Sequence, residues 1–275
     1  MIGPRTRCLG VLGWPVGHSF SPAMQNAALA ALGLDWVYGA FAVAPDQLAT
    51  AIRGAAALGF AGLNLTIPHK EAALALCDPD AEAALAGAVN TLVFTAGGRP
   101  RGHNTDVYGF RQLLVEAKVE VRGARAAVLG AGGAARAVVL ALRAEGATAV
   151  VVSRSARRLV FADGSTVEHR PWTGASLETL LPTVDLLVDA TPRGLVVDGK
   201  APAEVALLGR HATVIDIAAK RPSALIQAAD GRGLRTAMGT AMLLHQGVRA
   251  LESWTGRPAP VEVMRAALAE AIAQP

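Results

Sequence analysis

Residues 126–142 have the sequence AAVLGAGGAARAVVLAL, which decides the fold of the second half of the chain. The apolar run 126–129 predicts a buried strand, and Gly130, Gly132 and Gly133 predict a tight turn after it. A helix is predicted over 134–144 and a second strand over 149–152, which completes a βαβ unit. Glycines let a backbone approach a pyrophosphate, and a helix N-terminus favours an anion. The stretch therefore predicts a dinucleotide site; the alternative is a turn that only packs the helix on the strand.

The residues after the second strand select between the two nicotinamide cofactors. A site that selects NAD places Asp or Glu about 20 residues after the glycines, on the ribose 2′-hydroxyl. This chain instead has Ser153-Arg154-Ser155, followed by Arg157 and Arg158. A guanidinium pairs with a 2′-phosphate through charge-assisted hydrogen bonds and stacks on adenine. NADP(H) is therefore favoured over NAD(H), with a solvated basic loop as the alternative.

Composition limits the class of protein. The 275 residues are 52% hydrophobic and 17% charged, which excludes a disordered chain and allows one large domain or two medium ones. The net charge of +4 comes from dispersed residues, which argues against a nucleic-acid partner and weakly favours an anionic ligand. Cys8 and Cys77 lack metal-ligand spacing. Because the sequence has no signal-like or membrane-length apolar run, we expect a cytoplasmic protein without membrane partners, acting as a monomer or homodimer.

The chain as a whole has an α/β pattern, in which short apolar runs alternate with Ala-rich helical stretches and predict parallel strands. We expect two domains. The first is an open α/β substrate-binding and catalytic domain at 1–106, joined by returning C-terminal helices at 240–275. The second is a Rossmann-like, NADP-binding domain at 107–239. Beyond the βαβ unit, strands are predicted at 8–13, 38–43, 63–66, 89–95, 186–190 and 213–217. Helices are predicted from a Ser21 cap to Gly33 and at 45–58, 69–76, 106–117, 241–254 and 260–273.

Polar residues in the first half lie at the ends of predicted strands, where α/β sheets bind ligands. Ser19 and Ser21 alternate, so both hydroxyls face one side of an extended segment, unless they serve only as helix caps. Asn64 and Thr66 share one face for the same reason. Lys70 is predicted at the start of the next helix, where a cation opposes the helix dipole; this unfavourable placement indicates a functional reason.

Two further motifs supply an amide and a carboxylate. Asn90 lies at the start of a predicted apolar strand. Asp106 follows Asn104-Thr105, and the alternative role for this motif is to cap the predicted long helix. Hydroxyls, amides, one ammonium and one carboxylate together suit a small polyhydroxylated acid. Lys70 and Asp106 can form an acid–base pair beside a hydride transfer.

These motifs, taken in order, resemble those of the shikimate dehydrogenase family over nearly the whole chain. The resemblance rests on Ser-x-Ser-Pro at 19–22, Asn-x-Thr-x-Pro-x-Lys at 64–70, Gly-Ala-x-Asn-Thr at 87–91, Asn-Thr-Asp-x-x-Gly at 104–109 and Gly-Ala-Gly-Gly-Ala at 130–134. It also rests on Ala-Thr-Pro-x-Gly at 190–194 and on Met-Leu-Leu-His-Gln-Gly at 242–247, before Trp-Thr-Gly at 254–256. The resemblance implies NADPH-dependent, reversible reduction of 3-dehydroshikimate to shikimate in aromatic amino acid biosynthesis.

Carried over position by position, the resemblance assigns roles to individual residues and implies no metal. Lys70 and Asp106 become the catalytic pair, with Lys70 as the proton donor. The substrate carboxylate, ring hydroxyls and their surroundings are bound by Ser19, Ser21, Asn64, Thr66, Asn90 and Gln246. The cofactor is bound by Gly130, Ala131, Gly132, Gly133 and Ala134 at the pyrophosphate, by Ser153, Arg154, Ser155 and Arg158 near the 2′-phosphate, and by Ile217 and Gly239 near the nicotinamide.

The chain departs from the family pattern on the nicotinamide and substrate side. The family usually has Asp-x-x-Tyr-x-Pro after its late strand, whereas this chain has Asp-Ile-Ala-Ala-Lys-Arg-Pro at 216–222, so Ala219 takes the place of the Tyr. Gln25 stands where His is frequent, and Thr240-Ala241 replaces part of a glycine-rich turn. Two alternatives therefore stay open: a relative acting on quinate or an amino-substituted ring, and a catalytically silent regulator that binds NADPH or shikimate. Arg154 argues against NAD-linked quinate oxidation, and the presence of Lys70 and Asp106 argues against the regulator.

Overall fold

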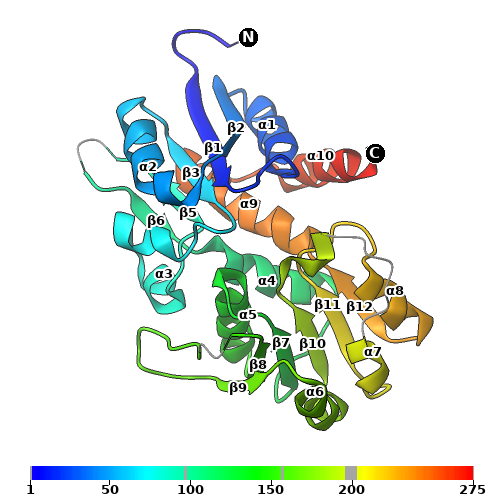
Figure 1. Cartoon of the computed structure of the whole chain (residues 1–275). Helices are drawn as coiled ribbons and strands as arrows, with labels where there is room; N and C mark the ends of the chain where they lie inside the picture. The colour runs from blue at the N-terminus through cyan, green and yellow to red at the C-terminus, as the bar shows by residue number, and fades with distance from the viewer. Residues whose placement is uncertain (1, 96–97, 156–157, 196–202, 275) are drawn as a thin grey trace. The chain divides into compact units, whose positions relative to one another are not determined.

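The computed structural model describes residues 2–95, 98–155, 158–195 and 203–274 (Figure 1). The chain forms two compact units, one of Met1–Thr105 with Leu243–Pro275 and the other of Asp106–Met242. Each unit contains its own six-stranded sheet. No helix within the described ranges is long and apolar enough to cross a membrane.

The sheet of the first unit is mixed rather than wholly parallel. Its strands are β1 (Arg7–Gly13), β2 (Trp36–Ala42), β3 (Gly62–Leu65), β4 (Asp78–Pro79), β5 (Thr91–Val93) and β6 (Arg101–His103), in the order β2-β1-β3-β5-β6-β4. β1 pairs parallel with β2 and β3, as expected, but β5 runs antiparallel to both β3 and β6. The expectation of parallel strands was wrong at β5, because only residues 94–100 separate it from β6 and a parallel crossover needs a longer connection.

Short helices cover this sheet. They are α1 (Ser21–Ala31), η1 (Pro45–Gln47), α2 (Leu48–Ala57), η2 (Ala72–Leu76), α3 (Ala81–Ala86), α10 (Val261–Ala273) and the part of α9 (Thr240–Thr255) that follows Met242. α10 packs against α1, which joins the two ends of the chain in one core (Figure 1). Two local predictions were wrong. Phe20, not Ser21, is the N-cap of α1, and the segment from His69 forms a turn before the 3-10 helix η2 instead of a continuous helix.

The sheet of the second unit is wholly parallel and confirms the Rossmann-like prediction. Its strands are β7 (Arg125–Leu129), β8 (Thr148–Ser153), β9 (Glu168–Pro171), β10 (Leu186–Asp189), β11 (Thr213–Asp216) and β12 (Arg235–Met238). The order β12-β11-β10-β7-β8-β9 is the 3-2-1-4-5-6 arrangement of dinucleotide-binding sheets, with β7 as its first strand. The switch point therefore lies where β7 meets β10, beside the predicted glycine turn.

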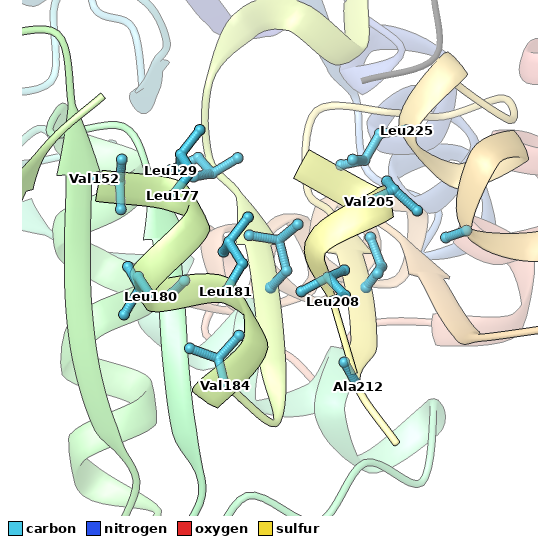
Figure 2. Close-up of a cluster of buried hydrophobic side chains, with 14 of the residues drawn as sticks. Leu129, Val152, Leu177, Leu180, Leu181, Val184, Val205, Leu208, Ala212 and Leu225 are labelled. Atoms are coloured by element: carbon cyan, nitrogen blue, oxygen red, sulfur yellow. The ribbon is translucent and has the colours of Figure 1, made fainter. Parts of the chain in front are cut away.

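Helices and a buried apolar core complete this unit. The helices are α4 (Thr105–Glu116), α5 (Gly133–Ala144), α6 (Gly174–Leu180), η3 (Leu181–Thr183), η4 (Pro192–Leu195), α7 (Ala203–Leu207) and α8 (Ala224–Gly231). Figure 2 shows Leu129 and Val152 from the sheet facing Leu177 and Leu180 of α6, with Val205 of α7 in the same cluster. Strands covered on both faces need continuous apolar residues, which explains the uninterrupted run 126–129.

Candidate functional site

A connected set of buried amides and hydroxyls lies at the ends of β3 and β5 in the first unit. Asn64 is 5% exposed, and its Nδ2 donates hydrogen bonds to the Asn90 carbonyl oxygen (3.1 Å) and to Thr91 Oγ1 (3.0 Å). Its Oδ1 accepts a hydrogen bond from the Tyr38 hydroxyl at 2.7 Å. The amide orientation of Asn64 is therefore determined by donors and acceptors on three neighbouring residues.

Asn90 continues this set towards α4. Its Nδ2 donates to Thr105 Oγ1 at 3.0 Å, and its Oδ1 accepts the Thr105 backbone N–H at 2.8 Å and the Thr91 hydroxyl at 3.1 Å. Asn90 thus attaches the segment before β5 to Thr105, within the first unit. Asp106, which follows Thr105 in the chain, is itself buried and lies in the first turn of α4.

The backbone of Lys70 lies next to this polar set. Its carbonyl oxygen accepts the N–H of Val89 at 2.8 Å, next to Asn90. Because Lys70 lies in the turn before η2, the argument that its ammonium opposes a helix dipole was wrong. The preceding His69 is buried, with Nε2 2.9 Å from the Val43 carbonyl oxygen, and burial lowers its pKa. His69 therefore anchors the turn without placing a second cation next to Lys70.

The two predicted serines have different surroundings. Ser19 Oγ accepts the backbone N–H of Ser21 at 3.3 Å, so the first serine supports the start of α1. Ser21 is buried and is the first residue of α1. Thr66 is half-buried just beyond β3, and Gln246 on α9 is buried with its Nε2 2.8 Å from the Leu243 carbonyl oxygen. The hydrogen bonds described above join two of the six predicted substrate ligands, Asn64 and Asn90, in one set, and separately link Ser19 to the backbone of Ser21.

The glycine turn of the second unit has the geometry of an anion cradle. Gly130 has a φ of 109° and donates its N–H to the Val152 carbonyl oxygen at 2.8 Å. Gly132 is the N-cap of α5, and no side chain in the described part of the chain caps this helix end. A Cβ added at Gly132 meets nothing within 4 Å. Open space at an uncapped helix N-terminus is the environment that a pyrophosphate requires.

A second turn, at the end of β10, lies against this cradle. A Cβ on Gly130 would approach the Ala190 carbonyl oxygen and Thr191 Cγ2, both at 3.2 Å. Asp189 Oδ1 holds the turn by accepting the Thr191 N–H (2.9 Å) and hydroxyl (2.6 Å). Its Oδ2 pairs with Arg193 at 2.9 Å, and Arg193 also pairs with Glu204 at 3.1 Å. Burial raises the pKa of Asp189, and the Arg193 charge counters that effect.

The loop predicted to bind the 2′-phosphate begins with a fixed serine. Ser153 is buried, and its Oγ donates to the Ser155 carbonyl oxygen at 2.7 Å. Because that bond uses the hydroxyl proton, the contact of 2.9 Å to His169 Nε2 requires His169 to donate. Arg154, Ser155 and Arg158 are exposed, and Arg157 lies outside the described residues.

The nicotinamide-side residues approach one another closely. A Cβ on Gly239 would lie 1.8 Å from the Ile217 carbonyl oxygen, so only glycine fits there. The Gly239 N–H donates to the carbonyl oxygens of Asp216 (2.8 Å) and Ala219 (3.1 Å). Ala219 is fully buried and presents no side chain to a ligand. The Lys220 ammonium donates to the Ile217 carbonyl oxygen at 2.9 Å.

Sequence reasoning missed several residues that support the predicted site. Thr91 and Thr105 lie inside the motifs that were recognised, and their spacing from Asn90 was a usable signal. Tyr38 lies in a predicted strand with no polar neighbour in sequence to mark it. The ion pairs of Arg193 depend on tertiary contacts that no local pattern reveals. Among the described residues, no group of three or more His, Cys, Asp or Glu side chains is placed to hold a metal ion.

Comparison with known proteins identifies the family. Residues 11–92 match the shikimate dehydrogenase substrate binding domain, and residues 239–269 match the shikimate 5′-dehydrogenase C-terminal domain. The shikimate dehydrogenase (NADP(+)) of Methanosarcina acetivorans is 45% identical over 97% of this chain and 99% of its own length. The enzyme of that name from Symbiobacterium thermophilum is 46% identical over 98% of this chain and 96% of its own.

A solved structure agrees with these relatives. The crystal structure of shikimate 5-dehydrogenase from Thermus thermophilus, in complex with NADP(H) and shikimate, is 36% identical with a TM-score of 0.85. The alignment covers 96% of this chain and 99% of that one. Identity of this level along nearly the full length, together with the two matched domains, leads to one assignment: the chain belongs to the shikimate dehydrogenase family.

Proposed function

We propose that this chain catalyses the NADP(H)-dependent, reversible reduction of 3-dehydroshikimate to shikimate, as a step of aromatic amino acid biosynthesis. The observation that carries the proposal is the buried, hydrogen-bonded set of Asn64, Asn90 and Thr105 beside Lys70. The relatives of this chain, which are named shikimate dehydrogenase (NADP(+)), support the same activity. Buried amides that are held by fixed partners can recognise ring hydroxyls selectively, because a ligand lacking them leaves polar groups unpaired. The reaction belongs in the cytoplasm, with a small-molecule partner and a monomeric or homodimeric enzyme.

The second unit, proposed at 107–239, fits NADP(H). Open space at Gly132 and the uncapped start of α5 match a pyrophosphate held by Gly130–Ala134. The exposed guanidinium groups of Arg154 and Arg158 match a 2′-phosphate, and Ser155 adds a hydroxyl beside them. Since the Ser153 proton is used within the loop, we assign Ser153 to loop support. Ile217 and Gly239 border the nicotinamide. When bound, NADPH supplies the hydride.

The first unit, proposed at 1–106 with 240–275, fits the substrate. Ser19 and Ser21 are assigned to the carboxylate, because hydroxyl donors satisfy carboxylate oxygens. Asn64, Thr66, Asn90 and Gln246 are assigned to the ring hydroxyls and their surroundings. Asn64 Oδ1 accepts one hydrogen bond in the structure and retains a second lone pair for a ring hydroxyl.

Lys70 and Asp106 are assigned to proton transfer. In the reduction, the Lys70 ammonium donates a proton to the substrate oxygen while the carbonyl carbon accepts a hydride. In the oxidation, the neutral amine takes that proton back. Asp106 is assigned as the carboxylate partner of this proton transfer.

Initial rates with a matrix of substrates test the proposal. Purified protein is mixed with shikimate or quinate, each with NADP⁺ or NAD⁺, and reduced nicotinamide is followed by absorbance. The proposal predicts fast turnover with shikimate and NADP⁺ alone, which also shows that the site functions with Ala219. Turnover with quinate or with NAD⁺ assigns the chain to a different substrate or cofactor. Tight NADPH binding without turnover of any pair favours the regulator.

A further inference from the structure

Tyr38 is a buried hydroxyl that the proposed chemistry leaves without a role. It lies on β2 and is 2% exposed, and its ring packs 6.0 Å from that of Trp254. Its hydroxyl donates a hydrogen bond of 2.7 Å to Oδ1 of Asn64, a residue assigned to substrate binding. We propose that Tyr38 is a positioning residue for the substrate, which sets the orientation of the Asn64 amide. The inference rests on the proposed function of this site.

The direction of the hydrogen bonds follows from the atoms available. Asn64 Nδ2 uses its two protons on Asn90 and Thr91, so Oδ1 faces Tyr38 and accepts. The phenol proton is thereby committed to Asn64. Burial raises the pKa of Tyr38 well above its usual value, so the phenol remains a donor at any assay pH.

This order of donors suits the recognition of a ring hydroxyl. Asn64 Oδ1 accepts the Tyr38 proton and keeps a second lone pair, which can accept a hydroxyl of the substrate. A phenylalanine at position 38 would leave the Asn64 oxygen without its protein donor and the amide without the contact that fixes its orientation.

The backbone of Tyr38 is held independently of its hydroxyl. Asn26 Oδ1 accepts the Tyr38 N–H at 2.8 Å, and Asn26 Nδ2 donates to the Tyr38 carbonyl oxygen and to that of Pro22, both at 2.9 Å. Asn26 and Pro22 belong to α1, the helix that begins at Ser21. Removal of the hydroxyl alone therefore leaves the position of β2 against α1 intact.

The test is Tyr38→Phe, with Trp254→Phe as the matched control. Trp254 donates one buried hydrogen bond, to the Leu92 carbonyl oxygen at 2.9 Å, and takes no part in the polar set. Both variants lose one buried donor in the same core. For Tyr38→Phe we expect KM for shikimate to rise about 5- to 30-fold, the equivalent of one lost hydrogen bond, while KM for NADP⁺ stays within about twofold. Trp254→Phe should lose stability and keep both KM values.

Three outcomes separate the inference from the proposed function. If the wild-type protein turns over shikimate and Tyr38→Phe changes only the unfolding free energy, as the control does, Tyr38 is structural and the inference is overturned. If Tyr38→Phe raises KM for shikimate and adding Asn64→Ala raises it little further, the two residues act as one unit and the inference is supported. A wild-type protein without shikimate turnover overturns the proposed function and the inference together.

Discussion

Replacement of Arg193 by Met should destabilise the second unit, because this side chain neutralises two buried carboxylates. Asp189 is 1% exposed and Glu204 is buried, and Arg193 pairs with both at 2.9 and 3.1 Å. Its guanidinium also lies 4.5 Å from the centroid of the Trp172 ring. Asp216 is fully buried on the neighbouring strand and raises the pKa of Asp189 further.

The expected loss of unfolding free energy is about 2–3 kcal/mol. Removal of one partner from a fully buried ion pair costs about 3–5 kcal/mol, because the other charge stays buried and uncompensated. The Arg193 side chain is 43% exposed, so water reaches the vacated position and reduces that cost. Loss of the contact with Trp172 adds about 0.5–1 kcal/mol.

The pH dependence identifies the cause. The pKa of Asp189 is raised in the folded protein, so its ionisation opposes folding as pH rises through that value. Without Arg193 the pKa rises further, so Arg193→Met should lose more stability relative to wild type at pH 8 than at pH 5. Asp189→Asn in the Arg193→Met background removes one of the two uncompensated charges and leaves Glu204, while the amide oxygen can still accept from Thr191. It should recover part of the loss.

Urea unfolding of the wild type, both single variants and the double variant measures these terms. A loss below about 0.5 kcal/mol for Arg193→Met, as for an ordinary surface change, would refute the reasoning. So would a loss that is independent of pH, or one that Asp189→Asn increases. Any of these three results would mean that an uncompensated charge on Asp189 is not what Arg193→Met costs.

Three further predictions concern the cofactor loop, the glycine turn and a helix cap. Gly132→Ala should raise KM for NADP⁺ roughly tenfold, because its φ of −89° tolerates Ala and the methyl enters the open cradle. It should lower the unfolding free energy by no more than about 1 kcal/mol, since Ala is a poorer N-cap than Gly; an unchanged KM would place the pyrophosphate elsewhere. Arg154→Asp should weaken NADPH binding in a fluorescence titration and favour NADH, whereas an unaltered preference would make Arg154 a surface charge. Asp80 caps α3 through Ala83 (2.7 Å) and contacts His103 Nδ1 at 2.7 Å; although burial raises its pKa, these bonds lower it overall. The stabilisation by the Asp80 carboxylate is therefore present above the unfolded-state pKa and lost in acid. Asp80→Ala should lower the unfolding free energy by about 1 kcal/mol at pH 7 and by progressively less below about pH 4. Asp80→Asn, which keeps the cap, is the milder control.

The long, strongly patterned elements of the fold were predictable from the sequence. The strand, glycine turn and helix at 126–144 appear as β7 and α5 because apolar period and glycine placement act over neighbouring residues. β9 was missed since it is short, three of its four residues (Glu168, His169 and Arg170) are polar, and it lies at a sheet edge. α7 has only five residues, too few to show a helical period. β12 and the antiparallel direction of β5 depend on pairing partners distant in sequence.

The candidate site was predictable where chemistry and motif coincide. Asn64 and Asn90 were expected at strand ends and lie in one buried set. Residues that orient them, such as Tyr38, gain their role only through tertiary packing. Lys70 was predicted partly because its charge would oppose a helix dipole, but no helix begins at Lys70 in the structure. Its carbonyl oxygen accepts the N–H of Val89, which places Lys70 beside Asn90 all the same.

The central claim is that the polar set around Lys70 is where shikimate is oxidised, and Lys70→Ala tests it most directly. Steady-state kinetics with shikimate and NADP⁺ should show kcat reduced by roughly 10²- to 10⁴-fold, as expected for loss of a positioned proton-transfer group. KM for NADP⁺ and the unfolding free energy should change little, since Lys70 is assigned no cofactor contact. An unchanged kcat, with shikimate turnover intact, would contradict the account and remove Lys70 from the chemistry.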